Sequence, residues 1–457
     1  MQFLTQETAQ SQAPPVRMKP IQVGLLGIGT VGSGTFNVLT RNQEEIRRRA
    51  GRGIEITMVA DLNVERAREI VGDRDRARVV ADAREIIANP EIDIVIELIG
   101  GYGIARALVL EAINAGKHVV TANKALLAVH GTEIFAAASA KGVMVAFEAA
   151  VAGGIPIIKA LREGLTANQV QWVAGIINGT TNFILSEMRD KGLDFDVVLK
   201  EAQRLGYAEA DPTFDIEGVD AAHKATLMSA LAFGIPVQFD KAHVEGITKL
   251  AAADIRYAEQ LGYRIKLLGI AKRRDDVGGI ELRVHPTLVP AKRLIANVEG
   301  AMNAVMVQGD AVGTTLYYGK GAGSEPTASA VIADLVDITR LHTADPDHRV
   351  PHLAFQAGEL RDTPVLPIDQ VRTAFYLRLR VADQKGVLSS ITAILAGADI
   401  SIDAVLQRES NEGEHQTDVI ILTHETQEGA MRAALAQMQA LPTVLAPIVS
   451  LRKEELA

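Results

Sequence analysis

A glycine-rich turn near the beginning of the chain, Gly27-x-Gly29-x-x-Gly32, constrains the fold more than any other feature. It follows a short apolar run, residues 21–26, and precedes a helical pattern. In such a strand–turn–helix unit the first glycine permits the tight turn, the second admits a pyrophosphate, and the third lets the helix pack closely on the strand. The helix N-terminus adds a partial positive charge for the phosphates. The turn therefore predicts a dinucleotide site, although a purely structural turn is the alternative. The predicted cofactor-binding residues here are Gly27, Gly29, Thr30, Val31 and Gly32.

Short apolar runs continue to alternate with helical patterns as far as about residue 150. The predicted strands are 21–26, 54–60, 93–98, 117–121 and 143–147, and predicted helices between them include 83–88, 104–115 and 124–140. Runs of this kind predict an α/β fold with a Rossmann-type, doubly wound parallel sheet. We expect this NAD(P)-binding domain to occupy residues 21–150, after a flexible, polar leader over residues 1–20.

Asp61 closes the second predicted strand, where an acidic residue would bind the ribose hydroxyls of the adenosine. This position favours NAD. Arg66 and Arg68 follow a few residues later and either meet the 2′-phosphate of NADP or lie on a solvated helix face. The sequence leaves NAD and NADP open.

The pattern changes after residue 150 and again after residue 343. Residues 151–343 mix helices, such as 219–233, with strands, such as 169–177 and 263–271, and predict an α+β domain with a mainly antiparallel sheet. Its last helix, 327–341, is expected to pack back on the first domain. Residues 344–371 contain several prolines and predict a linker. Residues 372–457 follow a βαββαβ order, which is typical of a ferredoxin-like module.

Composition excludes several classes of function. The chain of 457 residues contains no cysteine, which excludes disulfides, thiolate zinc sites and cysteine nucleophiles. Its formal net charge of −9 argues against nucleic acid as a partner. No apolar run approaches the ~20 residues of a membrane span, so we expect a cytoplasmic protein with no membrane partner.

Four motifs, taken in order, resemble the homoserine dehydrogenase family. They are Thr121-Ala122-Asn123-Lys124, then 175–182 (GIINGTTN), then 206–224 with Glu209, Asp215, Asp220 and Lys224, then 319–327 (GKGAGSEPT). The similarity covers about residues 21–341, and residues 375–451 resemble an ACT domain. The chain resembles the monofunctional type with a C-terminal ACT domain. The resemblance implies reversible NAD(P)H-dependent reduction of L-aspartate 4-semialdehyde to L-homoserine, a step of threonine and methionine biosynthesis.

The resemblance assigns the catalytic roles. Lys224 matches the proposed proton donor, and Asp220 matches its acidic partner. The two residues lie on one face of the predicted helix, where an exposed ion pair is the alternative. Because a carboxylate opposes a lowered lysine pKa, Asp220 is expected to position Lys224 or the substrate. Lys124, after a strand end, is expected between nicotinamide and substrate, where it would polarise the carbonyl; an ordinary helix-start lysine is the alternative.

The resemblance also implies the binding residues. Glu209 would bind the substrate through its ammonium group, with an ordinary turn carboxylate as the alternative. Asp215 matches a second acidic site residue of the family. Thr180 belongs to the 178–182 turn, whose hydroxyls and helix N-terminus would bind the substrate carboxylate or simply form an N-cap. Gly323 would approach the nicotinamide end of the cofactor.

The family resemblance further implies a structural sodium ion. Its ligands would be backbone carbonyls at Glu148, Val151, Gly153 and Ile155. Three histidines, His118, His130 and His223, lack paired spacing, so structural or exposed roles are expected for them.

Regulation and assembly are also implied only by resemblance. Residues 383–386 (DQKG) link strand to helix where ACT domains commonly hold amino-acid effectors at subunit interfaces, and threonine is the expected effector. A module without ligand is the alternative. The family suggests a homodimer or homotetramer.

Two other functions stay open: a non-catalytic NAD(P)- and amino-acid-sensing regulator, and another amino-acid dehydrogenase. The absence of cysteine excludes one further reaction of the same aldehyde, its oxidation to an acyl phosphate, because that reaction would need a cysteine nucleophile.

Overall fold

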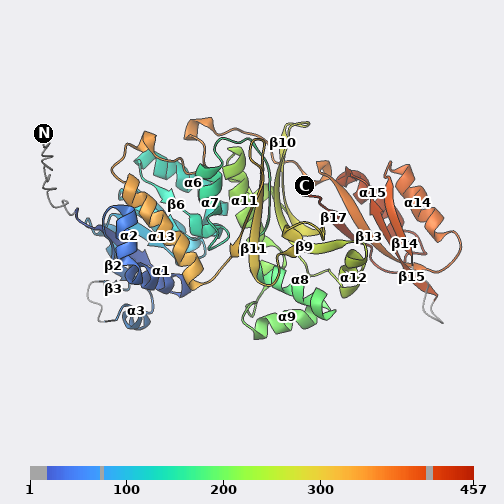
Figure 1. Cartoon of the computed structure of the whole chain (residues 1–457), viewed down its shortest axis with the longest axis horizontal. Coiled ribbons are helices and arrows are strands. Elements are labelled where there is room, and N and C mark those ends of the chain that lie inside the picture. Colours follow the sequence, from blue (N-terminus) through green and yellow to red (C-terminus); the bar gives the residue numbers. More distant parts are fainter. Residues whose placement is uncertain (1–17, 73–76, 408–414, 457) are drawn as a thin grey trace, which may run out of the picture.

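The computed structural model describes residues 18–72, 77–407 and 415–456. Three parts follow one another along its longest axis (Figure 1): a parallel sheet flanked by helices, a central antiparallel sheet and a C-terminal α/β module. Most of the predicted leader, residues 1–17, lies outside the described residues. In the described parts of the chain, no helix is long and apolar enough to cross a membrane.

The first sheet has six parallel strands in the order 3-2-1-4-5-6, the order of a Rossmann-type sheet. The prediction of a doubly wound sheet is confirmed. The strands are β1 (Ile21–Leu26), β2 (Ile54–Ala60), β3 (Arg78–Val80), β4 (Ile94–Glu97), β5 (His118–Thr121) and β6 (Val145–Ala146). The helices are α1 (Thr30–Arg41), α2 (Gln43–Ala50), α3 (Val64–Val71), α4 (Ala83–Ala88), α5 (Gly103–Asn114) and α6 (Lys124–Lys141). Sequence analysis did not identify β3, which has three residues, or α2, which is mostly charged.

The helix α13 (Ser324–Leu341) returns from the second domain and packs beside α1 in the first (Figure 1). Its apolar residues, among them Val331 and Leu335, belong to the same buried cluster as Val23 and Phe36. The two helices approach so closely that a Cβ at Gly34 would lie 2.4 Å from Ser324 Oγ. The first core is therefore completed by a segment about 300 residues away.

The central sheet begins with five strands that pair antiparallel with their neighbours, as the sequence predicted. They are β12 (Gly313–Lys320), β11 (Met302–Gly309), β7 (Val170–Ile176), β9 (Tyr263–Arg274) and β10 (Gly279–Pro290), with β8 (His243–Val244) beside β10. Helix α7 (Ile157–Lys159) is followed directly by a π-helical turn, η2 (Ala160–Gly164). The other helices are α8 (Gly179–Lys191), α9 (Phe195–Arg204), α10 (Thr213–Ile216), α11 (Val219–Phe233) and α12 (Ala252–Gln260). Short 3-10 turns are η1 (Glu148–Ala150), η3 (Phe239–Lys241) and η4 (Ile295–Asn297).

Helix α11 lies at the centre of the molecule, between the central sheet and α6 (Figure 1). Every residue from Asp220 to Phe233 is buried. A helix that is buried all round belongs to the core of a protein. Polar side chains near its N-terminus are therefore taken out of water and need partners.

The C-terminal module has the strand order β17-β13-β15-β14, which is ferredoxin-like. Its elements are β13 (Arg372–Ala382), α14 (Val387–Gly397), β14 (Ile402–Gln407), β15 (Gln416–Thr423), β16 (Thr426–Gln427), α15 (Glu428–Gln439) and β17 (Val449–Lys453). The connection that precedes it contains η5 (Pro346–His348), η6 (Ala357–Glu359) and η7 (Ile368–Gln370).

The central and C-terminal sheets are continuous, which the sequence did not predict. Strand β17 pairs in parallel with β10 through Thr287–Arg452 and Leu288–Lys453, and together the strands form one 11-stranded sheet. Arg452 is buried beside this seam and binds the carboxylates of Glu245 and Glu428. The module is thus joined to the central domain by strand pairing and by charge.

Candidate active site

The glycine-rich turn has the geometry that a dinucleotide needs. Gly27 has φ +89°, and a Cβ there would lie 2.9 Å from the carbonyl oxygen of Leu98. A Cβ at Gly32 would lie 2.2 Å from the carbonyl oxygen of Gly27, whereas a Cβ at Gly29 would meet no atom within 4 Å. Among the described residues, no side chain caps the N-terminus of α1, so its first backbone N–H groups stay available for an anion. The first and third glycines are required by the turn, and the second faces open space.

The carboxylate of Asp61 ties the end of β2 to this turn. Its Oδ2 accepts the backbone N–H of Ile28 at 2.9 Å, and its Oδ1 accepts that of Asn63 at 2.8 Å. Arg66 and Arg68 are exposed on α3. This geometry leaves the choice between NAD and NADP open.

A second glycine turn lies beside the first. Gly323, with φ +128°, precedes α13, whose N-terminus has no side-chain cap in the part of the chain that the structure describes. The Ser324 hydroxyl donates to the carbonyl of Thr30 at 2.8 Å. The fold therefore brings Gly323 next to the start of α1, although the two turns are far apart in sequence.

Two lysines converge on the carboxylate of Asp220. Lys224 Nζ, one helical turn along α11, lies 2.7 Å from Asp220 Oδ2. Lys124 Nζ reaches from the first residue of α6 to Asp220 Oδ1 at 3.0 Å. Lys224 also donates to the carbonyl of Ile177 at 2.7 Å, which leaves one of its three N–H groups for a further acceptor. The predicted pair Asp220–Lys224 is buried, with side chains 6% and 11% exposed, and is no surface ion pair.

The turn before α8 adds a second carboxylate to this group. Asn178 Nδ2 donates to Asp215 Oδ1 at 2.7 Å and to Asp220 Oδ2 at 2.8 Å. Its Oδ1 accepts the N–H of Thr181 and caps α8. Sequence analysis named this turn for its hydroxyls and N-cap but did not anticipate that Asn178 joins Asp215 to Asp220. An Asn before a helix indicates a cap, and nothing local indicates the acids that its amide meets.

Burial and the neighbouring charges move the two lysine pKa values in opposite directions. Burial, together with the charge of Lys124, lowers the pKa of Lys224 more than Asp220 and Asp215 raise it. For Lys124, burial also lowers the pKa, but Asp220, with help from Asp215 and Glu209, outweighs it and the pKa is raised. Burial would raise the pKa of Asp220, yet Lys224 and Lys124 hold it well below its usual range. Burial and the charge of Asp220 raise the pKa of Asp215.

Thr180 and Glu209 lie at the rim. The Thr180 hydroxyl donates to the carbonyl of Tyr207 at 2.8 Å, so it fixes the loop that carries Glu209. Glu209 is exposed and close enough to Lys124 to raise its pKa. The fold thus brings together Lys124, Glu209, Asp215, Asp220, Lys224 and the turn containing Thr180.

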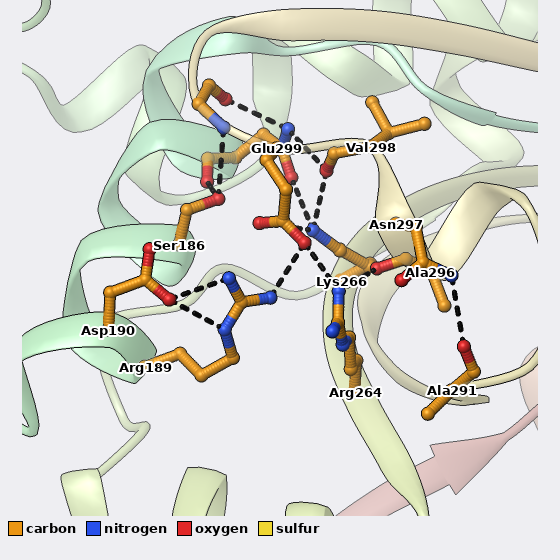
Figure 2. Close-up of polar contacts among 12 residues, drawn as sticks. Ser186, Arg189, Asp190, Arg264, Lys266, Ala291, Ala296, Asn297, Val298 and Glu299 are labelled. Carbon is orange, nitrogen blue, oxygen red and sulfur yellow. Dashed lines mark hydrogen bonds and ion pairs between the residues drawn. The ribbon is translucent and has the colours of Figure 1, made fainter.

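A charge cluster, half-buried except for the buried Lys266, holds helix α8 in place (Figure 2). Glu299 Oε1 accepts from Arg189 and Arg264, each at 2.6 Å, and Lys266 Nζ lies 3.6 Å from Glu299 Oε2. Burial lowers the pKa of Lys266 to about 8. Lys266 also donates to Asn182 Oδ1 at 3.2 Å in the first turns of α8. These contacts fix the helix whose N-terminus carries Asn178.

The predicted sodium ligands form one loop next to the second glycine turn. A Cβ at Gly153 would lie 2.4 Å from the carbonyl oxygen of Gly321. The carbonyls of Glu148 and Ile155 each accept a backbone N–H, while the described residues donate no hydrogen bond to those of Val151 and Gly153. Two backbone carbonyls are therefore free for a hard cation, which prefers oxygen ligands.

The histidines have structural positions. His118 Nδ1 accepts the backbone N–H of Met144. His223 packs between Phe214 and Phe239, and burial lowers its pKa to about 4. His130 lies 6.3 Å from Tyr102, ring centre to ring centre.

Comparison with known proteins identifies the family. Family models match for the NAD-binding domain of homoserine dehydrogenase over residues 27–148, homoserine dehydrogenase over 156–336, and the ACT domain over 375–442. The chain is 60% identical to homoserine dehydrogenase of Pseudomonas aeruginosa, covering 96% of this chain and all of that one. It is 56% identical to that of Neisseria gonorrhoeae with the same coverage. A crystal structure of homoserine dehydrogenase from Thiobacillus denitrificans is 66% identical, with a TM-score of 0.92 over 96% of this chain and 100% of that chain.

The chain belongs to the homoserine dehydrogenase family. It is an NAD(P)-dependent oxidoreductase that interconverts L-aspartate 4-semialdehyde and L-homoserine, a step of threonine and methionine biosynthesis. The expected family, fold class and activity are therefore confirmed. The alternatives of a non-catalytic sensor and of another amino-acid dehydrogenase are not supported.

Proposed function

We propose that Lys224 donates the proton in aldehyde reduction and that Lys124 stabilises the developing negative charge on oxygen. The bridging of both ammonium groups by the single carboxylate of Asp220 carries this proposal. A proton donor works best with a pKa near the working pH, and burial lowers the pKa of Lys224 in that direction. A charge stabiliser must stay cationic, and Asp220 raises the pKa of Lys124.

When bound, the nicotinamide would supply the hydride that adds to the aldehyde carbon and leaves an alkoxide on the carbonyl oxygen. Lys224 then transfers a proton from Nζ to the alkoxide oxygen and becomes a neutral amine. In homoserine oxidation the same neutral amine accepts the proton. Asp220 orients Lys224 and stays ionised in both directions, since two lysines hold its pKa low. Lys124, with a third of its side chain exposed, faces the open side of the site.

The substrate would be held by the rim residues. Glu209 and Asp215 are anionic groups suited to the substrate ammonium. The Thr180 turn and the first N–H groups of α8 suit its carboxylate. Exchanging Glu209 for Gln should raise KM for aspartate semialdehyde more than it lowers kcat.

The test is Lys224→Ala, assayed for NAD(P)H oxidation with aspartate semialdehyde. Loss of a general acid should lower kcat by about 10²–10⁴, while cofactor binding, followed by NAD(P)H fluorescence, survives. Lys191→Ala is the matched control, because Lys191 also pairs with an acid four residues earlier but is exposed. A kcat close to that of the control would exclude Lys224 as the proton donor.

Cofactor preference, sodium and regulation need separate experiments. The anion-binding turn suits NAD and NADP alike, whereas Asp61 favours NAD and the exposed Arg66 and Arg68 would suit the 2′-phosphate of NADP, so kcat/KM is to be compared for both. The free carbonyls of Val151 and Gly153 support a sodium ion, which should raise Tm in NaCl relative to choline chloride.

An amino-acid effector is proposed for the ACT module. The turn 383–386 at the start of α14 supports threonine there, with inhibition that Asp383→Ala weakens. A homodimer or homotetramer is to be tested by light scattering, with and without threonine.

A further inference from the structure

We propose that Asn178 is a positioning residue of the reaction: its carboxamide spans Asp215 and Asp220 and keeps the two carboxylates apart and correctly aimed. The proposal rests on the function given above, because it concerns the same site. Asn178 acts through the two acids that it binds.

The orientation of the carboxamide follows from its neighbours. Nδ2 carries two hydrogens, and both are used, at 2.7 Å to Asp215 Oδ1 and at 2.8 Å to Asp220 Oδ2. Oδ1 accepts the Thr181 N–H at 2.8 Å and the Thr181 hydroxyl at 2.9 Å. A flipped amide would set its oxygen against two carboxylates and its NH₂ against an N–H donor. Because Asn178 is only 4% exposed, water cannot relieve such a mismatch.

The bridge matters because the two acids repel each other. Carboxylates that come this close tend to share one proton unless donors satisfy both. Asp215 faces Asp220 and Lys224 from α11 and Lys124 from α6. Burial and Asp220 raise its pKa, whereas Asn178 and the two lysines lower it. Without the amide, Asp215 would take up a proton at higher pH and lose the charge that suits a substrate ammonium.

The bridge also sets the geometry of the proton donor. Asp220 Oδ2 accepts from Asn178 and from Lys224 Nζ. The Asn178 amide therefore fixes the position of Asp220 Oδ2, the oxygen that orients the ammonium group of Lys224. A displacement of about 1 Å in a group that orients catalysis can cost about 10²-fold in rate.

A purely structural role as N-cap of α8 makes a different prediction, and two variants that keep the cap separate it from the positioning role. Asp and Ser cap helices about as well as Asn, so Asn178→Asp and Asn178→Ser should both keep α8. Asp cannot donate to the acids and adds a third negative charge. Ser adds no titratable group near neutrality and is too short to span both carboxylates.

The experiment measures Tm, NAD(P)H binding and the pH profile of kcat/KM for aspartate semialdehyde in the full-length enzyme. We expect cofactor binding near wild type in both variants and a Tm near wild type in Asn178→Ser. Asn178→Asp should have a lower Tm, because its carboxylate is buried against those of Asp215 and Asp220. Asn178→Asp should lower kcat/KM by about 100-fold. Asn178→Ser should lower it less and move the acidic limb of the profile to higher pH. The control is Asn297→Asp, because Asn297 also donates twice through Nδ2, but at an exposed position and to backbone carbonyls rather than to catalytic acids.

Several results would overturn the proposal. Activity of Asn178→Asp within about threefold of the control would reduce Asn178 to a cap. If Asn178→Asp fails to fold, Asn178→Ser decides the question through its acidic limb, and an unmoved limb with normal kcat/KM refutes the role. Failure of the proposed function itself is seen separately, as normal activity in Lys224→Ala and Asp215→Asn.

Discussion

Exchanging Asp220 for Asn tests most directly whether Lys224 is the proton donor and Lys124 the charge stabiliser. The change keeps the shape of the side chain but removes the charge that faces Lys224 Nζ at 2.7 Å and Lys124 Nζ at 3.0 Å. Burial already lowers the pKa of Lys224, and Asp220 is the largest influence that opposes this effect. In the variant, the pKa of Lys224 must therefore fall further.

The size of the effect follows from the contact. An opposite charge in direct contact shifts a side-chain pKa by about 1–3 units. Reduction of the semialdehyde needs Lys224 protonated, so the alkaline limb of its kcat–pH profile should move down by about 1–3 pH units. Oxidation of homoserine needs Lys224 neutral, so the rising limb of its kcat–pH profile should move down by the same amount. Leaving buried cations without their partner should also lower the free energy of unfolding by about 3–5 kcal/mol.

The assay is kcat against pH in both directions, with urea unfolding measured in parallel. Asp254→Asn serves as the control, since Asp254 is a fully buried carboxylate bound to Arg378 far from the site. It should lose comparable stability and keep both limbs in place. An alkaline limb in Asp220→Asn that stays in place or moves to higher pH would refute the assigned roles.

Three further results are expected. Gly29→Ala should keep the wild-type Tm, because a Cβ there meets only open space, and should weaken NAD(P)H binding by about tenfold or more, because that space is where the pyrophosphate would lie. Gly32→Ala, with a Cβ 2.2 Å from a carbonyl oxygen, should lose about 1–3 kcal/mol of stability. Equal Tm values for the two variants would contradict this reasoning. Arg452→Met leaves two glutamates without their cation at the β10–β17 seam, so calorimetry should show an early unfolding transition for the C-terminal module. The pKa of Lys266 is about 8 in the folded protein and 10.5 in an unfolded chain. Between these pH values the unfolded chain binds more protons, so the free energy of unfolding should rise with pH. The urea midpoints of Lys266→Met should lack this rise.

Features that depend on neighbours along the chain were predictable from the sequence. Helix α11 has the predicted bounds, and β1 and β2 match their apolar runs. The glycine turn was predicted because its backbone requirements are local. By contrast, β3, α2 and β12 were not identified: the first is too short, the second too charged, and the third lies half exposed at a sheet edge.

Local signals in the sequence were enough to predict the glycine turn, most of the strands and helices, and the placement of Asp220 and Lys224 on one helical face. The packed fold was needed to show that Lys124 shares Asp220, that Asn178 joins this carboxylate to Asp215, and that β17 extends the central sheet. The reason is physical. Periodicity and turn preferences act over a few residues, whereas a buried charge takes whichever partners the packed chain places beside it, and the removal of water then sets its pKa.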